Sequence, residues 1–298
     1  MGASLNVVDP AASNLGGFTA YTTTSTLRTS KGAKCFGQGT GGSGKPFTLK
    51  GPTAIGLLED GSKFYSALRP LSITDHYLDS FGPGLCGIGS SVASGSSYWD
   101  LIVNHKESQT GGGQKIQQGD QVLWYLAPSF PAGPELRLQV PSIVPAAGDY
   151  PATVYQYDLS TGARSPAQGV TVDFASQPTD SAGHTTIHVN GPSGSVAAVG
   201  ATRTSDAAIP DKALVCIGTA QTCSAGSSNP IFGSRHADRI ATTPQADFVS
   251  AGKGDDTIKI TAGGIDNVDC GGGKDTVIRL RADHDDHIHS NCEKVVKR

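Results

Sequence analysis

Five aspartates near the end of the sequence recur at nearly constant spacing, and a carboxylate repeated in this way could hold cations. The intervals between successive aspartates are nine, nine, ten and nine residues. A β-branched apolar residue follows each aspartate two positions later, and glycines precede the later copies. The aspartates are Asp238, Asp247, Asp256, Asp266 and Asp275, and the apolar residues are Ile240, Val249, Ile258, Val268 and Val277. This part of the chain is therefore predicted to be a stack of short repeats.

The elements that must position these carboxylates are tight glycine turns between short strands. Residues 251–259 and 270–278 match the nonapeptide of parallel β-rolls with one substitution at the first position. Glycine lets the backbone turn with positive φ, the aspartate faces the turn, and the apolar residue points into the roll. Because two nonapeptides complete one coil, alternate aspartates should stack. We expect Asp238, Asp256 and Asp275 along one edge, Asp247 and Asp266 along the other, and Asp286 with Ile288 as a degraded last rung.

A row of carboxylates and turn carbonyls offers only oxygen ligands, which suit calcium. Over roughly residues 226 to 298 the chain resembles the RTX, or haemolysin-type, calcium-binding repeat family, and the resemblance implies Ca²⁺ as cofactor. The motif is best formed around Asp256, Asp266 and Asp275 and least well formed at Asp238. The expected ion-binding positions are Asp238, Asp247, Asp256, Asp266, Asp275, Asp286, Gly252, Gly254, Gly264, Gly271 and Gly273.

An alternative is a glycine-rich roll that keeps this shape without an ion. His236 and Gln245 stand where the fourth-position glycine belongs in the first turns. Residues 226 to 298 also hold eleven acidic and ten basic side chains, so the local charge does not demand a cation. Both interpretations predict the same coil and differ in what neutralises its carboxylates.

The segment Asp283–His289 is dense in carboxylates and imidazoles. Imidazoles there could bind zinc, nickel or copper, and Asp286 could complete the last calcium turn. We favour an exposed loop that caps the open end of the coil. No G-x-S-x-G, H-E-x-x-H or P-loop motif occurs, so we expect no catalytic site.

Composition and charge narrow the class of protein. At 298 residues the chain is long enough for two or three domains. Its 39 Gly, 17 Pro and 16% charged residues indicate β structure. A net charge of -3 without a basic stripe argues against nucleic acid as a partner, and no apolar run is long enough for membrane insertion. The first residues lack the features of a signal peptide, so we expect a mature or trimmed start.

Six cysteines fall two to each of three segments, and none forms C-x-x-C. The even count, the absence of zinc-like spacing and the calcium-type repeat favour an oxidising, extracellular compartment and three disulfides. Six cysteines allow fifteen pairings. We expect neighbours to pair: Cys35 with Cys86, Cys216 with Cys223, and Cys270 with Cys292.

The first segment, residues 1–128, combines strand-like runs with one predicted helix at 53–60. Strands are expected at 98–103 and 121–126. An aromatic strand, a glycine turn and the phrase GDQVLWY are similar to the transcobalamin C-terminal-like family, which implies a β-grasp module with one helix across a mixed sheet. In cobalamin carriers this module closes over a corrin beside a helical barrel, and no stretch here could build that barrel. Trp99 and Trp124 could stack on a ligand or pack in the core.

The middle segment, residues 134–218, contains recurring short apolar stretches separated by turn residues, a spacing typical of a β-sandwich. The text from Gly169 to Asn190 resembles bacterial immunoglobulin-like spacers. Strands are expected at 136–140, 153–157, 170–174, 185–189, 195–201 and 213–217.

The expected fold is mainly β: a β-grasp module (1–128), an immunoglobulin-like β-sandwich (134–218) and a parallel β-roll (226–298). Such a chain is predicted to be a secreted or cell-surface, non-catalytic structural or adhesive protein whose roll is stabilised by calcium. Two alternatives are a subunit of an extracellular filament or surface layer, and a module that binds a corrin or glycan. The expected partners are calcium ions and a surface polymer, a glycan or further copies of the chain.

Overall fold

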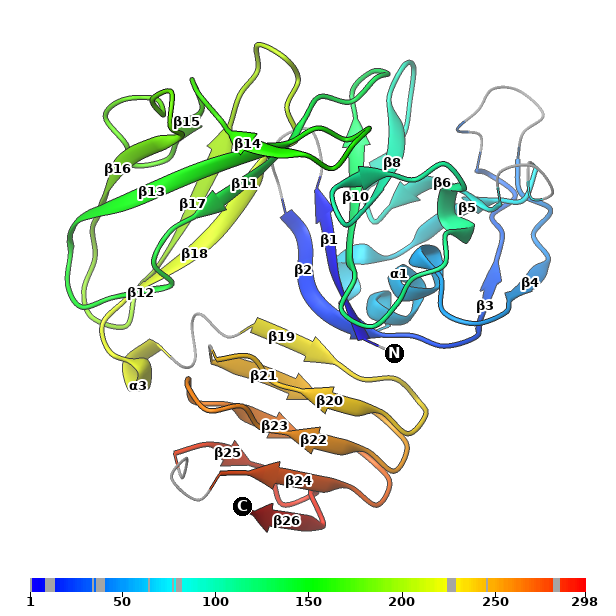
Figure 1. The fold of residues 1–298 in the computed structure, drawn as a ribbon. Helices are drawn as coiled ribbons and strands as arrows, with labels where there is room; N and C mark the ends of the chain where they lie inside the picture. Colours follow the sequence, from blue (N-terminus) through cyan, green and yellow to red (C-terminus); the bar gives the residue numbers. More distant parts are fainter. Residues whose placement is uncertain are drawn as a thin grey trace. The chain divides into compact units, whose positions relative to one another are not determined.

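The chain folds mainly as β-strands, as its composition predicts (Figure 1). The computed structural model describes residues 2–8, 14–33, 35, 41–63, 65–76, 78, 82–223, 229–244, 246–280 and 285–298. It divides into two compact units, Met1–Ala132 and Gly133–Arg298. Across the described ranges, no helix has the length and apolar character needed to cross a membrane.

A mixed sheet forms the centre of the first unit. Strand β1 (Gly2–Val8) pairs in parallel with β10 (Gln121–Ala127) and antiparallel with β2 (Asn14–Tyr21). Strand β8 (Tyr98–Val103) continues the sheet antiparallel to β10, and the two-residue strand β9 (Lys106–Glu107) pairs with the end of β8. The two strands expected here are therefore confirmed, and they are neighbours in the sheet.

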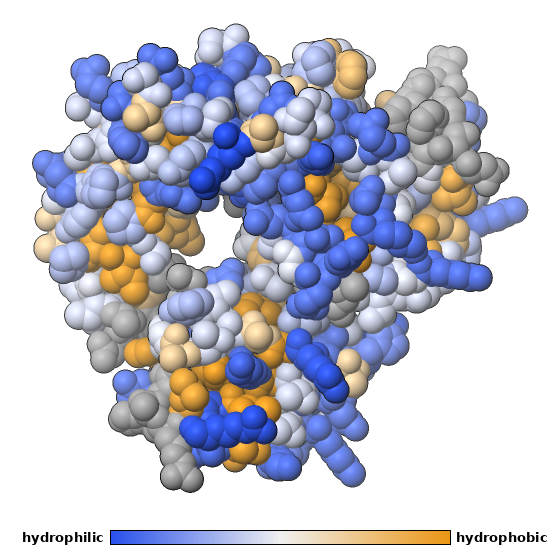
Figure 2. Space-filling model, in the orientation of Figure 1, coloured by the Kyte–Doolittle hydropathy of each residue, from blue (hydrophilic) through white to orange (hydrophobic). Residues whose placement is uncertain are grey.

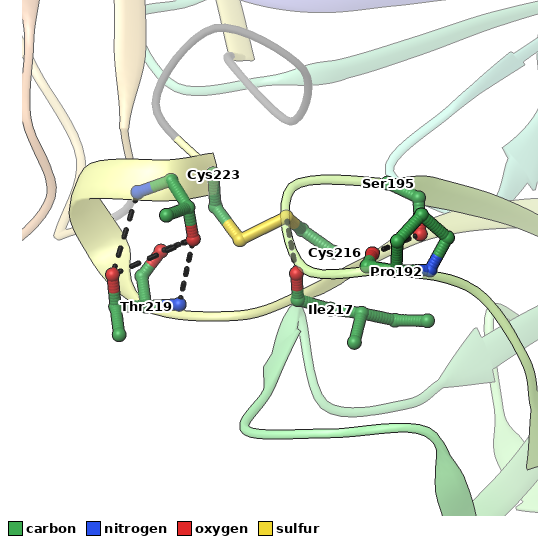
Figure 3. Close-up of a disulfide and its surroundings, with 7 residues drawn as sticks. Pro192, Ser195, Cys216, Ile217, Thr219 and Cys223 are labelled. Carbon is green, nitrogen blue, oxygen red and sulfur yellow. Dashed lines mark hydrogen bonds between the residues drawn. A yellow bond between two sulfur atoms is a disulfide. The ribbon is translucent and has the colours of Figure 1, made fainter.

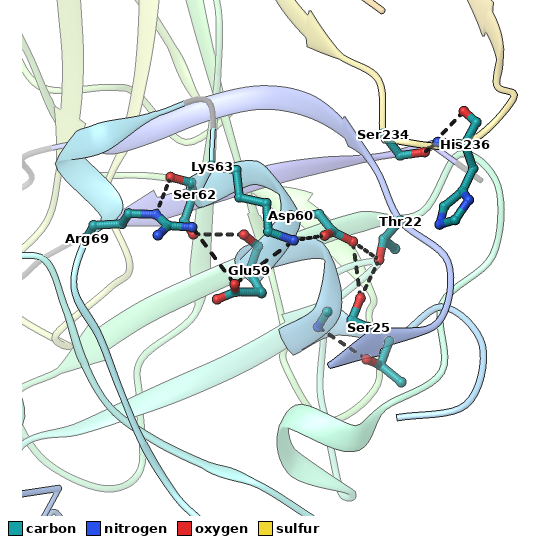
Figure 4. Close-up of polar contacts among 11 residues, drawn as sticks. Thr22, Ser25, Glu59, Asp60, Ser62, Lys63, Arg69, Ser234 and His236 are labelled. Carbon is teal, nitrogen blue, oxygen red and sulfur yellow. Dashed lines mark hydrogen bonds and ion pairs between the residues drawn. The ribbon is translucent and has the colours of Figure 1, made fainter. Parts of the chain in front are cut away.

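Helix α1 (Ala54–Ser62) packs against this sheet through β1 and β2. Its N-cap is Thr53, whose side chain accepts a main-chain N–H of the first turn and so satisfies a group that a helix start leaves unpaired. Farther along the helix, Asp60 accepts hydrogen bonds from the hydroxyls of Thr22 (2.8 Å) and Ser25 (3.1 Å), as Figure 4 shows. These bonds fix the helix to the segment that follows β2.

Smaller elements complete the first unit. Among its described residues, two strands form a two-stranded antiparallel sheet, three more form a small antiparallel sheet, and two 3₁₀ turns lie between elements. Their bounds are β3 (Ser25–Arg28), β4 (Pro46–Leu49), β5 (Leu71–Thr74), β6 (Gly84–Ile88), β7 (Ser91–Val92), η1 (Ser66–Leu68) and η2 (Gly111–Gly113).

The second unit begins with two four-stranded sheets. One sheet joins β11, β13, β14 and β16, and the other runs in the order β12-β18-β17-β15. Buried aliphatic side chains from both sheets, among them Val154, Ile187, Val199 and Val215, form one core. The strands are β11 (Glu135–Gln139), β12 (Ile143–Val144), β13 (Gly148–Tyr157), β14 (Arg164–Pro166), β15 (Thr171–Val172), β16 (His184–Val189), β17 (Val196–Thr202) and β18 (Asp211–Ile217).

The sequence located six of these strands and missed two. Strands β12 and β14 are two and three residues long, too short to show an alternating pattern. The stretch expected as a strand over 170–174 is a strand only at Thr171–Val172, because Phe174 adopts a left-handed conformation with φ of 64°. Strand β13 is ten residues long because its first half pairs with β16 and its second half with β11.

The C-terminal part of the second unit is a coil of two parallel sheets. One sheet is β19-β21-β23-β25 and the other is β20-β22-β24-β26, so each strand pairs with the strand two places farther along the chain. This pairing confirms that two repeats make one coil. The bounds are β19 (Asn229–Phe232), β20 (Arg239–Ala241), β21 (Asp247–Ser250), β22 (Thr257–Lys259), β23 (Asn267–Asp269), β24 (Thr276–Arg279), β25 (His287–Ile288) and β26 (Lys294–Lys297).

The apolar residue of each repeat points into the coil. All five predicted residues from Ile240 to Val277 are at most 2% exposed, and in the register of the sheets Val249 lies beside Val268 and Ile258 beside Val277. Ile288 is only half-buried, in agreement with a degraded last rung. With one such aliphatic side chain from each of β20 to β24, the core of the coil is narrow.

Glycine is required in the turns because successive coils touch there. Gly271 has φ of 81°, and a Cβ built on it would collide with the carbonyl oxygen of Gly252 in the preceding coil. Gly273 has the same relation to Gly254. Gly272, between them, has open space where a Cβ would lie. The glycines of the repeat therefore differ in how much the fold depends on them.

Figure 2 shows hydrophilic residues over most of the visible face, with hydrophobic residues gathered in smaller patches. On the roll, Phe248, Leu280 and Val295 are between 37% and 45% exposed.

Substituting the two neighbouring glycines tests this packing. Gly271→Ala should destabilise the roll by about 2 to 4 kcal/mol because it combines a steric clash with an unfavourable φ. Gly272→Ala should change stability by less than about 1 kcal/mol. Calorimetry measures the free energy of unfolding, and hydrogen exchange of residues 229–298 locates the effect. Equal losses in both variants would contradict the close approach of the coils.

Candidate functional site

The predicted carboxylates form hydrogen-bonded ladders along the two edges of the roll. On one edge, Oδ1 of Asp256 accepts the main-chain N–H of Asp238 (2.7 Å), and Oδ1 of Asp275 accepts the N–H of Asp256 (2.8 Å). On the other edge, Oδ1 of Asp266 accepts the N–H of Asp247 (2.9 Å). Each carboxylate thus reaches the turn of the preceding coil, and the expected division between two edges is confirmed.

Each ladder continues to the last coil. Asp266 donates its N–H to Oδ1 of Asp286 (3.1 Å), as the sequence predicts. On the first edge, Asp275 donates its N–H to Oε2 of Glu293 (2.8 Å), a residue that the sequence analysis missed. We call Asp238, Asp256, Asp275 and Glu293 the first ladder, and Asp247, Asp266 and Asp286 the second ladder. A search at the coil period would have found Glu293, because the sequence separations along the first ladder are 18, 19 and 18 residues.

The two ladders differ along their length in what the second carboxylate oxygen contacts. We call the first aspartate of each ladder, Asp238 and Asp247, the upper rungs, and Asp256, Asp266 and Asp275 the lower rungs. Oδ2 of Asp238 accepts the N–H of Ser234 (2.6 Å). Asp247 accepts the side-chain amide of Asn229 (2.9 Å) and the N–H of Thr243 (2.6 Å). The protein therefore satisfies both oxygens of Asp247 and the Oδ2 of Asp238.

The lower rungs carry buried oxygens that the protein leaves unpaired. Oδ2 of Asp256, Asp266 and Asp275 is buried and has no hydrogen-bond partner among the described residues, and each side chain is 1% exposed. A buried carboxylate oxygen without a partner is costly to keep charged. These are the three residues at which the sequence motif is best formed.

Burial also disturbs the ionisation of these carboxyl groups. Loss of solvent raises the pKa of Asp256 and of Asp266 to about 7, and the charges of neighbouring ladder residues add to that effect. Burial likewise raises the pKa of Asp275. Burial thus disfavours the charged form of all three carboxyl groups.

The described side chains alone do not enclose a metal ion. Among the residues whose placement is known, no three His, Cys, Asp or Glu side chains converge in a group that could hold one. An ion at a lower rung would thus combine Oδ2 of an aspartate with main-chain carbonyls, which calcium accepts as ligands. The predicted glycines lie in these turns with positive φ: Gly252 (99°), Gly254 (123°), Gly264 (29°), Gly271 (81°) and Gly273 (149°).

The histidine-rich segment after the roll is only partly described. Asp283 and His284 of the predicted cluster lie outside the described residues, as does Gln245 of the second turn. Asp286 is buried at its rung of the second ladder, whereas His287 and His289 are exposed. The carboxylate belongs to the ladder, and these two imidazoles face solvent.

All three predicted disulfides are present. Cys35 pairs with Cys86 in the first unit, and Cys270 pairs with Cys292 in the roll. Figure 3 shows the third, which joins Cys216 on β18 to Cys223 at the end of the short helix α3 (Ala220–Cys223). No cysteine of the described chain remains free.

The first unit contains a cavity of about 490 Å³ beside its two tryptophans. We call it the tryptophan cavity. Trp124 lies opposite Leu101 in the sheet, and Trp99 is two residues before Leu101, so both indoles project from one face. Trp99 and Trp124 are 7% and 2% exposed, and both line the cavity. Their burial agrees with packing in the core, and stacking on a ligand stays a prediction.

A buried carboxyl group, that of Asp100, projects from the face of β8 opposite to Trp99 and Leu101. Asp100 is 6% exposed, and its Oδ1 accepts the N–H of Leu101 (2.9 Å), while Oδ2 has no partner among the described residues. Burial, together with the negative charge of Glu107, raises the pKa of Asp100 to about 7. Burial and the charge of Asp100 raise the pKa of the neighbouring Tyr98 to about 12.

The raised pKa of Asp100 predicts a pH-dependent stability of the first unit. Between its unfolded pKa near 4 and its folded pKa near 7, the folded state binds the proton more tightly. This contribution is complete below about pH 4 and is lost as the pH rises to about 7. Between pH 5 and 8 the melting temperature of the wild type should therefore fall relative to that of Asp100→Asn, which keeps the bond to Leu101.

Tryptophan fluorescence follows this transition, because both tryptophans of the chain lie in the first unit. Asp75→Asn in the same unit is a suitable control, since hydrogen bonds from Ser43 outweigh partial burial and lower the pKa of Asp75. Its difference from the wild type should not vary with pH. A constant difference between the wild type and D100N would show that Asp100 does not titrate in this range.

The chain was compared with protein families, curated proteins and solved structures. No protein-family model, curated protein or solved structure matches the chain. The resemblances drawn from the sequence therefore depend on the residues quoted for them.

Proposed function

We propose that the chain is an extracellular, non-catalytic structural or adhesive protein whose C-terminal roll is stabilised by calcium. The observation that carries this proposal is the unpaired buried oxygen on Asp256, Asp266 and Asp275. One such oxygen recurs in each lower rung, beside glycine turns that bring main-chain carbonyls close together. Calcium would supply the positive charge that these rungs lack.

Because the core of the roll is narrow, a bound ion would be an important contribution to the stability of the roll. Strands β20 to β24 each contribute one fully buried aliphatic residue and β25 and β26 contribute none, so burial of apolar surface alone stabilises the coil only modestly. An ion that binds the folded roll and not the unfolded chain adds its binding free energy to the stability. The Cys270–Cys292 disulfide closes the last coil and supports the same region.

The proposed compartment is outside the cell. Three disulfides indicate an oxidising environment. Calcium sites of extracellular modules have dissociation constants of about 0.1 to 1 mM, which fits a site built from one or two carboxylates and carbonyls. Loss of calcium would then destabilise the roll, and the roll would become fully stable only in the calcium-containing medium outside the cell.

Calcium should raise the stability of the intact protein. At 100 times the dissociation constant, an ion that binds only the folded state contributes about 2.7 kcal/mol. Calorimetry in EDTA and in about 10 mM calcium measures the change. Hydrogen exchange should show increased protection of the ladder amides, including that of Asp238. An unchanged transition together with unchanged exchange would sink the calcium proposal.

Asp256→Asn separates an ion site from a purely structural ladder. The amide keeps an oxygen that accepts the N–H of Asp238 and removes the buried charge. We expect D256N to match or exceed the wild-type stability in EDTA and to lose at least about half of the calcium-induced gain. Asp255→Asn removes a charge from the exposed neighbour and should retain the full gain. Equal gains in the two variants would exclude Asp256 as a ligand.

A further inference from the structure

We propose that the outer face of the β20-β22-β24-β26 sheet binds a linear anionic polysaccharide. The proposal rests on the adhesive function proposed above and names the class of its partner. Figure 1 shows the four strands in the C-terminal roll. We call the outward-facing residues of these strands the basic face, because they include Arg239, Lys259 and Lys294 and no acidic residue.

The register of the sheet brings the basic side chains to one side of the roll. Ile240, Ile258 and Val277 are buried in the coil, so the residues before and after each of them point outward. At about 4.8 Å per strand, the first and last strands of the sheet lie roughly 14 Å apart. One outward row across the four strands is Arg239, Thr257, Thr276 and Lys294, and the other is Ala241, Lys259, Ile278 and Val296.

The positive charge of the basic face is exposed and is not offset within the face. Arg239, Lys259 and Lys294 are all exposed to solvent. Lys259 and Lys294 form no ion pair with any described residue. The exposed carboxylate of Asp255 lies in the turn before β22, where it accepts the main-chain N–H of Lys274 (2.9 Å). The two rows therefore present cations to solvent.

The ladders explain how a chain with a net charge of -3 can carry a basic surface on its roll. All the ladder aspartates are buried, and a proton or a bound ion would neutralise them. The described acidic residues of the roll that keep solvent exposure are Asp255, Asp269, Asp285 and Glu293. The described basic residues of the roll with exposed or half-buried side chains are Arg235, Arg239, Lys253, Lys259, Lys274, Arg279, Lys294, Lys297 and Arg298. Burial of the carboxylates thus leaves the surface of the roll with an excess of positive charge.

The other outward residues suit a sugar polymer better than a nucleic acid or a membrane. Thr257 and Thr276 place hydroxyl groups between the cations, and a hydroxyl both donates and accepts hydrogen bonds, as sugar hydroxyls do. The two rows contain no aromatic side chain on which nucleic-acid bases could stack. Ile278 and Val296 are half-buried in the sheet surface, which leaves no large apolar side chain to insert among lipids. Cations and hydroxyls at strand spacing match the charged and hydroxyl groups that repeat along a linear polysaccharide.

Dextran sulfate and unmodified dextran share one sugar backbone and differ in charge, so together they test the proposal. The intact protein is titrated into each fluorescein-labelled polymer, and the anisotropy is followed. Dextran sulfate should bind saturably, with an affinity that falls at least about tenfold between about 50 and 200 mM salt, whereas dextran should not bind. Absence of saturable binding would overturn the proposal, as would equally tight binding of duplex DNA or of phosphatidylserine vesicles.

Paired lysine substitutions locate the binding surface. The double variant K259Q/K294Q should bind dextran sulfate at least about tenfold more weakly, because each exposed cation adds to the attraction of an anionic surface. The control K106Q/K212Q removes the same charge from exposed lysines of β9 and β18 and should retain the wild-type affinity within about twofold. K259R/K294R keeps both charges and should also bind normally, with circular dichroism confirming that each variant folds. Equal losses in K259Q/K294Q and in the control would exclude the basic face as the site.

Calorimetry of the same wild-type samples in EDTA and in calcium separates this proposal from that of calcium binding. A protein that calcium stabilises but that does not bind dextran sulfate would overturn the polysaccharide proposal and leave the calcium proposal intact. Binding of dextran sulfate without stabilisation by calcium would support the basic face and contradict the calcium proposal alone.

Discussion

The roll depends on one hydrogen bond, repeated at every coil, between a carboxylate and a main-chain N–H of the coil before it. A tight turn leaves an amide at the buried edge that no strand partner can reach, and such an amide costs about 1 to 3 kcal/mol if it remains unpaired. Aspartate has the length to accept it from the next coil, as Asp256 does from Asp238. Close stacking is the condition for this bond, and it requires glycine where Gly271 passes over the carbonyl of Gly252.

The same bond places a carboxylate in a buried position, where its second oxygen also needs a partner, and this partner differs between the upper and lower rungs. Asp238 and Asp247 use polar groups of nearby residues to satisfy their second oxygens. Asp256, Asp266 and Asp275 lie between coils on both sides, and their second oxygens make no hydrogen bond with the described residues, although the side chain of Thr242 is close enough to lower the pKa of Asp266. The glycines that permit close stacking carry no side chain that could donate. Close stacking of the coils thus allows the hydrogen bond that stabilises each turn, and it also leaves a buried carboxylate oxygen for which we propose a cation as partner.

The period of the sequence predicted much of this architecture. Alternation of the aspartates between two edges followed from counting two repeats per coil, and the buried residues from Ile240 to Val277 followed from the position after each aspartate. Glu293 was not predicted because the nine-residue motif is no longer recognisable there, although the spacing of 18 residues from Asp275 is still that of one coil. Two-residue strands and the turn at Phe174 depend on tertiary contacts, which local sequence does not encode. The tryptophan cavity likewise needed the sheet register that brings Trp99 and Trp124 to one face.

The direction of the ladder bonds has a consequence for the order in which the chain matures. Every acceptor follows its donor in the sequence, by 18 to 20 residues in both ladders. A ribosome makes the donor first, so each turn amide waits without its acceptor until the following coil has been synthesised. The ladder bonds can therefore form first at the end of the roll that is synthesised earlier and last at the end that is synthesised later.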